Sequence, residues 1–445
     1  MFENKKILIL GMARSGYEAA KVLVLNNQIV ITDIKNQDEE KVRELRQMGV
    51  NLIITNEPDK ILDETFDYVI KNPGIKFDNP CIVKANQLKI PITNEVEVAY
   101  QLLKGKVKII GITGSNGKTT TTTLIYEFLK EDGIKCHLGG NIGVPVCALV
   151  ELSKQNDILV LEISAHQLHD VIDFKTDIGI MTNLSEVHLD HFGTYENYKQ
   201  NKLKIFDHHT NQNLAILNKE NDDVMNLTKD IKSKKIYFSS KETSDCYLKN
   251  NSIYYFNELI VNITDIRIKG IHNLENIMCA VIAVKQFGVS NESIRTVLKN
   301  FAGVEHRIEY VTKINNREFY NDSKSTNVKS TQVALSTFKG PIILLLGGLN
   351  RKIPFDDLTD YLANVSHIVC YGETKNIIKE FALKVNVDCE VVDTLEEAVK
   401  VAYNISNEND TILFSPACAS WDQFKDFEER GREFKKIVEK IGEEI

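Results

Sequence analysis

A short loop of small residues followed by a lysine and a threonine carries the clearest chemical signal in this sequence. Such a loop binds phosphate through its backbone N–H groups and through the N-terminus of the following helix. A lysine at its end reaches the β- and γ-phosphates, and a threonine hydroxyl ligates Mg²⁺. The loop lies between an expected strand and an expected helix and consists of Gly114, Ser115, Asn116, Gly117, Lys118 and Thr119. It predicts a nucleoside triphosphate site, at which Thr120 also faces the phosphates.

The loop departs from the general phosphate-loop pattern at one position. That pattern has a glycine six residues before the lysine, where this chain has Ile112. The nearest glycines are Gly111 and Gly114. A glycine turn that precedes a lysine and a threonine by chance is the alternative interpretation, but the flanking strand and helix favour phosphate binding.

Polar side chains follow the next two buried strands that we expect, at 157–164 and 177–184. Parallel strands present ligands at their carboxyl ends, so Glu162 is expected beside the glycine loop, where a carboxylate suits Mg²⁺. His188 follows the second strand and is predicted to lie near the metal. Zinc held by His188 and His191 is the alternative, but no third soft ligand stands at a metal-binding spacing.

Two residues of reactive type gain no chemistry from spacing alone. Lys202 lies in an expected helix at 195–206, where the default interpretation is a lysine exposed to solvent. Cys418 is a nucleophile by type, but the sequence places no histidine or other base beside it. Spacing therefore gives neither residue a role.

A second glycine turn, near the N-terminus, resembles part of a dinucleotide-binding fingerprint. The tight turn at 11–16 precedes a helix expected at 17–27, and Asp33 ends the next strand about twenty residues on. Ala13 stands where the fingerprint has its middle glycine, which hinders close approach of a pyrophosphate. The prediction is a nucleotide diphosphate held by Ser15 and the turn backbone. A dehydrogenase that binds a dinucleotide is the weaker alternative.

Two more polar segments end strands in the last third of the chain. The segment at 321–327, Asn-Asp-Ser-Lys-Ser-Thr-Asn, places Asp322 at a strand end, where it suits a ribose contact beside a phosphate site. A capped turn is the alternative. The segment at 415–420 offers small side chains and exposed amides, which suit a substrate carboxylate.

The elements that position these residues alternate between strand and helix along the whole chain. Helical spacing is clearest at 272–288 and 422–439, and apolar runs ending in small or polar residues mark the strands. This alternation predicts parallel sheets with crossover helices. The fold class is therefore α/β with three domains: a Rossmann-like domain at 1–97, a central phosphate-loop domain with a mostly parallel sheet at 98–303, and a Rossmann-like domain at 304–445.

Composition narrows the class of protein. The 445 residues carry a formal net charge of −8, which argues against a nucleic-acid-binding protein. The eight cysteines include no CxxC pair, so reduced thiols in a cytosol are expected. The apolar run at 7–10 is too short for a signal peptide, and no window of about 18 apolar residues predicts a membrane span. We expect a soluble, cytoplasmic protein without membrane insertion.

Six motifs, in this order, resemble those of the Mur ligases of peptidoglycan synthesis: GITGSNGKTT, GGNIGVP, LEISAHQL, GVEHR, NDSKSTN and SPACASWDQF. The resemblance runs from the N-terminal glycine turn to the C-terminal helix. GSNGKT and NDSKSTN resemble the wider superfamily, which includes folylpolyglutamate synthase. SPACASWDQF and the compact N-terminal unit resemble the members that add D-glutamate.

This resemblance implies a fold and a reaction. The family has a UDP-binding N-terminal domain, a central ATPase domain and a C-terminal domain that closes over the amino acid. The γ-phosphate of ATP passes to the carboxylate of UDP-N-acetylmuramoyl-L-alanine, and the amine of D-glutamate attacks the resulting acyl phosphate. A tetrahedral intermediate then loses phosphate and leaves an amide. The resemblance also implies two Mg²⁺ ions, and we expect a monomer.

The resemblance assigns roles residue by residue. Lys118, His188 and Lys202 are implied to be catalytic, and Lys202 aligns with a lysine that is carbamylated and supports the second Mg²⁺. A carbamate converts a cation into a metal-binding anion. With Lys202, the implied metal ligands are Thr119, Glu162 and His188.

The binding residues implied by the resemblance fall into three groups. ATP contacts the loop from Gly114 to Thr120 and also Asn141, Arg307 and Asp322. The UDP substrate contacts Ser15, Asp33, Asn72, Gly74, Asn141 and Ser164. D-glutamate contacts Lys324, Thr326, Arg351, Ser420 and Phe427.

One departure from the family pattern bears on the amino-acid site. Where some members have GGDGK, this chain has Gly-Gly-Leu-Asn-Arg at 347–351. Arg351 is taken to replace the lysine that pairs with the side-chain carboxylate of D-glutamate, and Lys352 is the alternative. Arginine pairs bidentately with a carboxylate, so the geometry of that contact differs from the lysine one.

Overall fold

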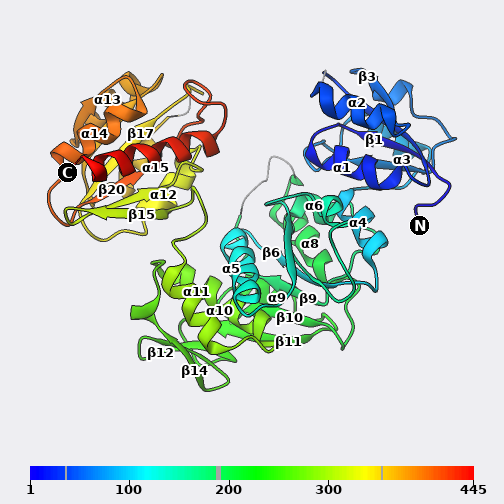
Figure 1. Cartoon of the computed structure of the whole chain (residues 1–445), viewed down its shortest axis with the longest axis horizontal. Helices are drawn as coiled ribbons and strands as arrows, with labels where there is room; N and C mark the ends of the chain where they lie inside the picture. The colour runs from blue at the N-terminus through cyan, green and yellow to red at the C-terminus, as the bar shows by residue number, and fades with distance from the viewer. Residues whose placement is uncertain (36–37, 187–191, 352–353, 445) are drawn as a thin grey trace. The chain divides into compact units, whose positions relative to one another are not determined.

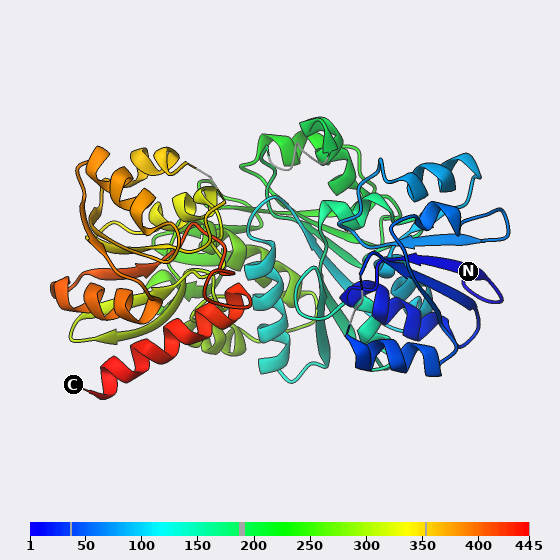
Figure 2. The same ribbon diagram turned by 90° about the horizontal axis from the view of Figure 1, so that it is seen from above.

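The computed structural model describes residues 1–35, 38–186, 192–351 and 354–444 (Figures 1 and 2). The chain divides into two units, each described here by itself: Met1–Ile266 with Ile271–Lys299, and Arg267–Gly270 with Asn300–Ile445. Two sheets lie in the first unit and one lies in the second. Of the helices in the part of the chain that the structure describes, none combines the length and apolar character that crossing a bilayer requires.

The N-terminal sheet is parallel and covered on both faces. Its strands are β1 (Lys6–Leu10), β2 (Gln28–Asp33), β3 (Asn51–Ile54), β4 (Tyr68–Lys71) and β5 (Ile92–Thr93), in the order β3-β2-β1-β4-β5. Its helices are α1 (Arg14–Leu23), α2 (Glu39–Gln47) and α3 (Pro80–Gln87). Ile7 and Ile9 pack with α1, whereas Leu8 and Leu10 pack with α3. Burial on both faces explains why β1 is a continuous apolar run.

Helix α4 (Glu95–Leu103) links the first sheet to the central one through two buried carboxylates. Glu97 Oε2 accepts three consecutive backbone N–H groups at 172–174, at 2.9–3.0 Å. Glu95 Oε2 accepts the N–H of Cys147 at 3.0 Å, while its Oε1 has no hydrogen-bond partner within the described residues. These contacts attach α4 to the central region.

Glu95 is expected to make the stability of the fold depend on pH. Burial, opposed by backbone donors, raises the pKa of its carboxyl from 4.5 to about 7. The folded state then holds this proton more tightly than the unfolded chain, so the free energy of unfolding should fall as pH rises from 4.5 to about 7. In Glu95→Gln, the free energy of unfolding measured with urea should lose this dependence on pH between pH 4.5 and about 7. The lost contribution is on the order of 3 kcal/mol. The exposed Glu131→Gln is the control, and an unchanged slope for Glu95→Gln would contradict the expectation.

The central sheet carries the glycine loop. Its strands are β6 (Lys108–Thr113), β7 (Cys136–Gly140), β8 (Ile158–Glu162), β9 (Ile178–Met181), β10 (Leu214–Asn218), β11 (Lys234–Ser239), β12 (Cys246–Lys249), β13 (Ser252–Tyr255) and β14 (Glu258–Asn262). The order β14-β13-β12-β11-β10-β9-β6-β8-β7 places β6 between β8 and β9. Pairing is parallel up to β12 and antiparallel beyond it, so the short strands β13 and β14 form an antiparallel edge of the sheet.

Helices cover this sheet and lead back to its loops. They are α5 (Lys118–Glu131), α6 (Ala165–His169), α8 (Tyr195–Leu203), α9 (Asp222–Leu227), α10 (Ile271–Lys285) and α11 (Asn291–Asn300). The helix that begins at the glycine loop, α5, packs against α10 (Figure 1). The helix expected at 272–288 is therefore α10, which begins one residue earlier and ends three residues earlier.

The second unit holds a sheet with helices on both faces. Its strands are β15 (Glu309–Ile314), β16 (Arg317–Asn321), β17 (Ile342–Gly347), β18 (Val365–Tyr371), β19 (Asp388–Val391) and β20 (Thr411–Phe414), in the order β15-β16-β20-β17-β18-β19. Its helices are α12 (Val328–Leu335), α13 (Lys375–Lys384), α14 (Leu395–Ile405) and α15 (Phe427–Glu443). One face packs with α12 and α13 and the other with α14 and α15. Only the β15–β16 pair among these described strands is antiparallel.

The α/β class with three mostly parallel sheets is confirmed, and two local expectations are wrong. The last helix begins at Phe427 rather than Asp422, because Asp426 caps it by accepting the N–H of Glu429. The first helix begins at Arg14 rather than 17, so the end of the expected turn is already helical. The three domain ranges stay predictions.

Candidate functional site

The glycine loop connects β6 to α5, and its shape depends on glycine at two positions. Gly114 and Gly117 have φ angles of 143° and 79°, a region that favours glycine. A Cβ on Gly117 would lie 2.1 Å from Oδ1 of Asn276, and one on Gly114 would lie 2.0 Å from Oγ1 of Thr182. The backbone thus packs directly against its neighbours. Helix α5 begins at Lys118, which puts its N-terminus at the loop, as phosphate binding requires.

The segment after β9 holds this loop from the side. Asn183 accepts the N–H of Asn116 at 2.9 Å through its side chain and the N–H of Ser115 at 2.8 Å through its backbone oxygen. Thr182 donates its hydroxyl to the backbone oxygen of Asn116 at 2.6 Å. The hydroxyls of Ser115 and Tyr198 are 3.0 Å apart. The N–H groups of Ser115 and Asn116 are therefore engaged by the protein in this structure, and their contact with phosphate stays a prediction.

Lys118 and Lys202 converge on the backbone oxygen of Gly114. The Nζ of Lys118 donates to it at 2.9 Å, and the Nζ of Lys202 donates to it at 2.7 Å. Lys202 is only 1% exposed, so its interpretation as a solvent-exposed lysine is wrong. Burial lowers the pKa of Lys202 well below its ordinary value, and the charge of Lys118 lowers it further, while Glu162 acts in the opposite direction. This environment favours the neutral amine.

Glu162, at the end of β8, meets two other predicted site residues. Its Oε2 accepts the hydroxyl of Thr119 at 2.8 Å, and its Oε1 accepts Nδ2 of Asn141 at 2.7 Å. The carboxylate is buried, with 2% exposure. Thr120 follows Thr119 in the first turn of α5. A buried carboxylate beside a threonine hydroxyl offers the hard oxygen donors that Mg²⁺ prefers, so these residues fit the implied ion.

The remaining predicted metal ligand cannot be placed. His188 lies at 187–191, outside the described residues, and so does His191. Among the residues that the structure does describe, no group of three or more His, Cys, Asp or Glu side chains has the arrangement of a metal site. The role of His188 and the zinc alternative both stay predictions.

The N-terminal glycine turn lies where the strand order reverses, between β1 and β4. Doubly wound sheets bind ligands at such points. Asp33 accepts the N–H of Met12 at 2.8 Å, and Asn72 donates Nδ2 to the backbone oxygen of Gly11 at 2.9 Å. Ser15 is the second residue of α1, which overlaps the end of this turn. The structure thus brings Asp33 and Asn72 to the turn at whose end Ser15 lies.

The other residues predicted for the UDP substrate lie on neighbouring loops. Arg14 donates to the backbone oxygen of Gly143 at 2.5 Å, which connects the N-terminal turn to the loop that begins at Asn141. Gly74 is exposed two residues after Asn72. Ser164 caps α6 by accepting an N–H, so the structure gives it a capping role, and its substrate contact stays a prediction.

In the second unit, Asp322 joins the loops that precede β15 and follow β16 and β20. Its carboxylate accepts the hydroxyls of Ser325 at 2.5 Å and Ser415 at 2.6 Å, and the N–H of Ile308 at 3.2 Å. Burial raises its pKa to about 6 despite these hydrogen bonds. Arg307 is exposed beside it, and its charge lowers that pKa. The ATP contacts of Arg307 and Asp322 stay predictions.

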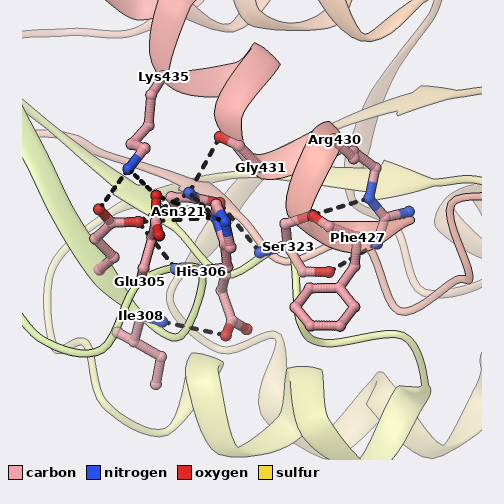
Figure 3. A network of polar contacts seen from close by, with 11 residues as sticks. Glu305, His306, Ile308, Asn321, Ser323, Phe427, Arg430, Gly431 and Lys435 are labelled. Carbon is pink, nitrogen blue, oxygen red and sulfur yellow. Dashed lines mark hydrogen bonds and ion pairs between the residues drawn. The ribbon is translucent and has the colours of Figure 1, made fainter. Parts of the chain in front are cut away.

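A polar network fixes the start of α15 against these loops (Figure 3). Buried Arg430 donates to Oγ of Ser323 at 3.0 Å, to its backbone oxygen at 2.8 Å, and to the backbone oxygen of Cys418 at 3.0 Å. Ser323 donates its hydroxyl to the backbone oxygen of Phe427 at 2.8 Å. The Nζ of Lys324 lies 5.6 Å from the ring centroid of Phe427. Two residues predicted for D-glutamate are therefore neighbours.

The network continues through Asn321 toward the middle of α15 (Figure 3). Nδ2 of Asn321 lies 3.0 Å from Nδ1 of His306 and donates to Glu309 at 3.0 Å and to the backbone oxygen of Gly431 at 3.2 Å. A Cβ on Gly431 would lie 2.2 Å from Nδ1 of His306, so glycine permits this close packing. Lys435 forms an ion pair with Glu309 at 3.0 Å. Helix α15 thus braces the strand that leads to Asp322.

A pocket after β17 brings together other residues predicted for D-glutamate. Thr326 and Arg351 both contribute to its lining. The guanidinium of Arg351 lies 4.7 Å from the ring centroid of Trp421. Ser420, directly before Trp421, is buried. The alternative carboxylate partner, Lys352, lies outside the described residues.

Sequence reasoning missed side chains that build these sites from neighbouring elements. Asn183 lies two residues after the end of the buried strand β9, and a polar residue at such a strand end is a usable signal. Tyr198 precedes Lys202 by one helical turn, the spacing at which side chains on a helix meet, and the Nζ of Lys202 lies 4.8 Å from its ring. Asn276 and Arg430 had no such signal, because each lies within the buried stripe of a helix.

Comparisons with known proteins agree with this architecture. Residues 112–284 match the family model of the Mur ligase middle domain, and residues 306–418 match that of the Mur ligase glutamate ligase domain. A Bacillus cereus protein named UDP-N-acetylmuramoylalanine–D-glutamate ligase is 46% identical over 99% of this chain and 98% of its own length. A Geobacillus kaustophilus protein of the same name is 44% identical over the same shares.

Solved structures of related ligases share the fold at lower sequence identity. UDP-N-acetylmuramate-alanine ligase MurC of Thermotoga maritima has a TM-score of 0.61 and 20% identity, covering 98% of this chain and 100% of that one. MurF of Acinetobacter baumannii has a TM-score of 0.60 and 19% identity, covering 99% and 92%. The 44–46% identity to the Bacillus and Geobacillus proteins over 99% of the chain, together with the two domain matches, places this chain in the Mur ligase family.

Proposed function

We propose that this protein is an ATP-dependent ligase that joins D-glutamate to UDP-N-acetylmuramoyl-L-alanine in peptidoglycan precursor synthesis. Identity of 44–46% over 99% of the chain to proteins named for this reaction supports the substrates. One structural observation supports the proposed chemistry: the Nζ atoms of Lys118 and Lys202 both donate to the backbone oxygen of Gly114. The negative charge of Glu162 also interacts with Lys202 and raises its pKa. We further propose that the protein acts in the cytoplasm as a monomer.

The proposed reaction has two steps. A carboxylate oxygen of the UDP substrate attacks the γ-phosphorus of ATP, and the bond from that phosphorus to the ADP oxygen breaks. The amine nitrogen of D-glutamate then attacks the acyl carbon, and phosphate leaves with the former carboxylate oxygen. Phosphoryl transfer needs positioning and charge neutralisation more than covalent help. Lys118 supplies positive charge, and His188 is proposed to assist beside it.

Mg²⁺, when bound, supplies further neutralisation of the phosphate charge. Thr119, Glu162, His188 and a carbamate on Lys202 are proposed to hold two ions. The carbamate forms when the neutral amine adds CO₂ and releases a proton, which suits the buried Lys202.

The binding residues follow the three groups that the resemblance implies. The glycine loop with Asn141, Arg307 and Asp322 is proposed to bind ATP. The UDP substrate is proposed to contact Ser15, Asp33, Asn72, Gly74, Asn141 and Ser164. D-glutamate is proposed to contact Lys324, Thr326, Arg351, Ser420 and Phe427.

Isotope transfer tests the proposed function and its acyl phosphate together. UDP-N-acetylmuramoyl-L-alanine labelled with a heavy oxygen isotope in its carboxylate is incubated with Mg-ATP and D-glutamate, and the masses of the products are measured by mass spectrometry. The released phosphate should carry one heavy oxygen, in equal amount to the new amide. Amide formation with unlabelled phosphate would contradict the acyl phosphate. Phosphate release without amide would favour a nucleotide-driven switch or transport ATPase.

Arg351→Ala is expected to weaken D-glutamate binding selectively. A charged hydrogen bond is worth about 1.5–3 kcal/mol, so the KM for D-glutamate should rise about 10- to 100-fold while the KM for ATP changes little. Arg351→Lys should restore part of the affinity, because lysine keeps the charge but loses the bidentate contact. Lys379→Ala, which removes an exposed cation from α13, is the matched control. Equal effects on both KM values would remove Arg351 from the amino-acid pocket.

A further inference from the structure

Two cysteines face each other across neighbouring strands of the second unit. Cys370 lies near the end of β18, and Cys389 lies in β19, which pairs with it in parallel. Their Sγ atoms are 3.5 Å apart. Both are free thiols; Cys370 is buried, whereas Cys389 is partly exposed. Neither cysteine belongs to the sets of site residues described above.

We propose that Cys370 and Cys389 form a reversible disulfide when the protein meets an oxidising low-molecular-weight disulfide. The thiolate of Cys389 attacks one sulfur of the small disulfide, which releases one small thiol and leaves a mixed disulfide. Cys370 then attacks Sγ of Cys389, the mixed disulfide breaks, and the second small thiol leaves. The two protons lost by the cysteines end on the two small thiols, so one disulfide is reduced for each one formed.

The surroundings of the two thiols suit this order of attack. Cys389 is the more exposed, and the hydrogen bond from Cys370 lowers its pKa, although burial and the charge of Glu390 act in the opposite direction. The same hydrogen bond and burial raise the pKa of Cys370. A reactive cysteine combines access with a lowered pKa, and a neighbouring cysteine resolves its adduct. A disulfide bond is about 2.05 Å long, so the sulfurs must approach by about 1.5 Å from their present 3.5 Å.

The pair is connected to the pocket that contains Arg351. The Cys370 thiol contacts the backbone oxygen of Lys375, the first residue of α13, at 3.2 Å. Thr374, directly before it, lines the pocket and donates its hydroxyl to the backbone oxygen of Gly348 at 3.2 Å. Closing the 3.5 Å gap to Cys389 draws Sγ of Cys370 toward its partner and leaves it with no proton to donate. The contact with the backbone oxygen of Lys375 then weakens, and the turn before α13 loosens. On the proposed function, on which this consequence rests, oxidation raises the KM for D-glutamate more than the KM for ATP.

Thiol mapping of the full chain tests the disulfide without reference to activity. The protein is equilibrated in glutathione buffers with a rising oxidised fraction, free thiols are alkylated, and peptides are analysed by mass spectrometry. Two of the eight free thiols should disappear together, and a peptide joined through Cys370 and Cys389 should appear and vanish again with dithiothreitol. Cys389→Ser should abolish this peptide, whereas Cys136→Ser, at another partly exposed cysteine, should retain it. A lasting glutathione adduct on Cys389, or both thiols still open to alkylation, would overturn the proposal.

Kinetics then test the connection to the pocket. The oxidised protein should have a KM for D-glutamate several-fold higher than that of the reduced protein. In the Cys389→Ser variant, oxidation should leave this KM unchanged. A joined peptide with unchanged KM values would overturn the connection and leave the disulfide standing. Absence of ligation in the reduced protein would overturn the proposed function, while the peptide map still reports on the disulfide.

Discussion

Lys202→Ala is expected to lose amide formation by about two to three orders of magnitude in kcat, as when one preorganised charge-stabilising group is removed from an active site. The amine is 1% exposed and lies 2.7 Å from the oxygen of Gly114, at the start of the glycine loop. Its lowered pKa favours the neutral form, which adds CO₂. Alanine removes the carbamate and with it the anion proposed to face the second Mg²⁺. Steady-state ligation measured with and without added CO₂ checks this result.

Rescue by small anions separates the carbamate from a purely structural role of Lys202. Formate and acetate should restore part of the activity of Lys202→Ala, because a short carboxylate fits the space left by the side chain and replaces the missing charge. Lys199→Ala, on the same helix, removes an ion pair with Asp223 and should retain activity. A folded Lys202→Ala protein with ordinary kcat would show that the role assigned by resemblance does not hold for this chain.

Lys118→Ala is expected to reduce kcat by a similar factor and for a different reason. The Nζ of Lys118 lies 2.9 Å from the backbone oxygens of both Gly114 and Ser115, so the ammonium stands over the loop that is proposed to hold the phosphates. Phosphoryl transfer spreads negative charge over the transferring oxygens, and the variant lacks the positive charge that Lys118 supplies there. Short carboxylates should not rescue this variant, because the missing charge is positive.

The controls for Lys118 come from the same helix. Lys130→Ala removes an exposed lysine from the other end of α5 and should leave ligation unchanged. Thermal unfolding of both variants should match that of the parent protein within about 1 kcal/mol, because Lys118 is only partly buried. Ordinary turnover by folded Lys118→Ala would refute the assignment of this loop to the triphosphate.

The sequence was sufficient to predict the parts of the site that lie in loops after strong strands. Gly114 to Thr119 and Glu162 each follow a long apolar run, so their place at the strand ends could be predicted from chain order and parallel pairing. The family resemblance added the expected substrates and a predicted role for Lys202. Spacing alone had placed Lys202 in solvent, because α8 is polar around its whole circumference and buries only Tyr198 and Lys202 among its described residues. Tertiary packing, which no local pattern encodes, decides that burial.

The ends of elements and the supporting side chains could not be predicted for related reasons. The last helix begins at Phe427 because the side chain of Asp426 caps it, and several candidate caps precede that position in the sequence. Arg430 lies among buried apolar residues of the same helix. Its acceptors are the hydroxyl and backbone oxygens of Ser323, 107 positions earlier in the chain, and the backbone oxygen of Cys418, 12 positions earlier. Such long-range partners become visible only when the chain is folded.

Phosphate release tests the central claim most directly. The purified protein is given Mg-ATP and UDP-N-acetylmuramoyl-L-alanine, and D- and L-amino acids are added one at a time. Release should require both the UDP substrate and D-glutamate, with L-glutamate inactive. Release driven by another amino acid would keep the ligase chemistry and change the substrate. Release that needs neither acceptor would contradict the account and favour an ATPase that joins nothing.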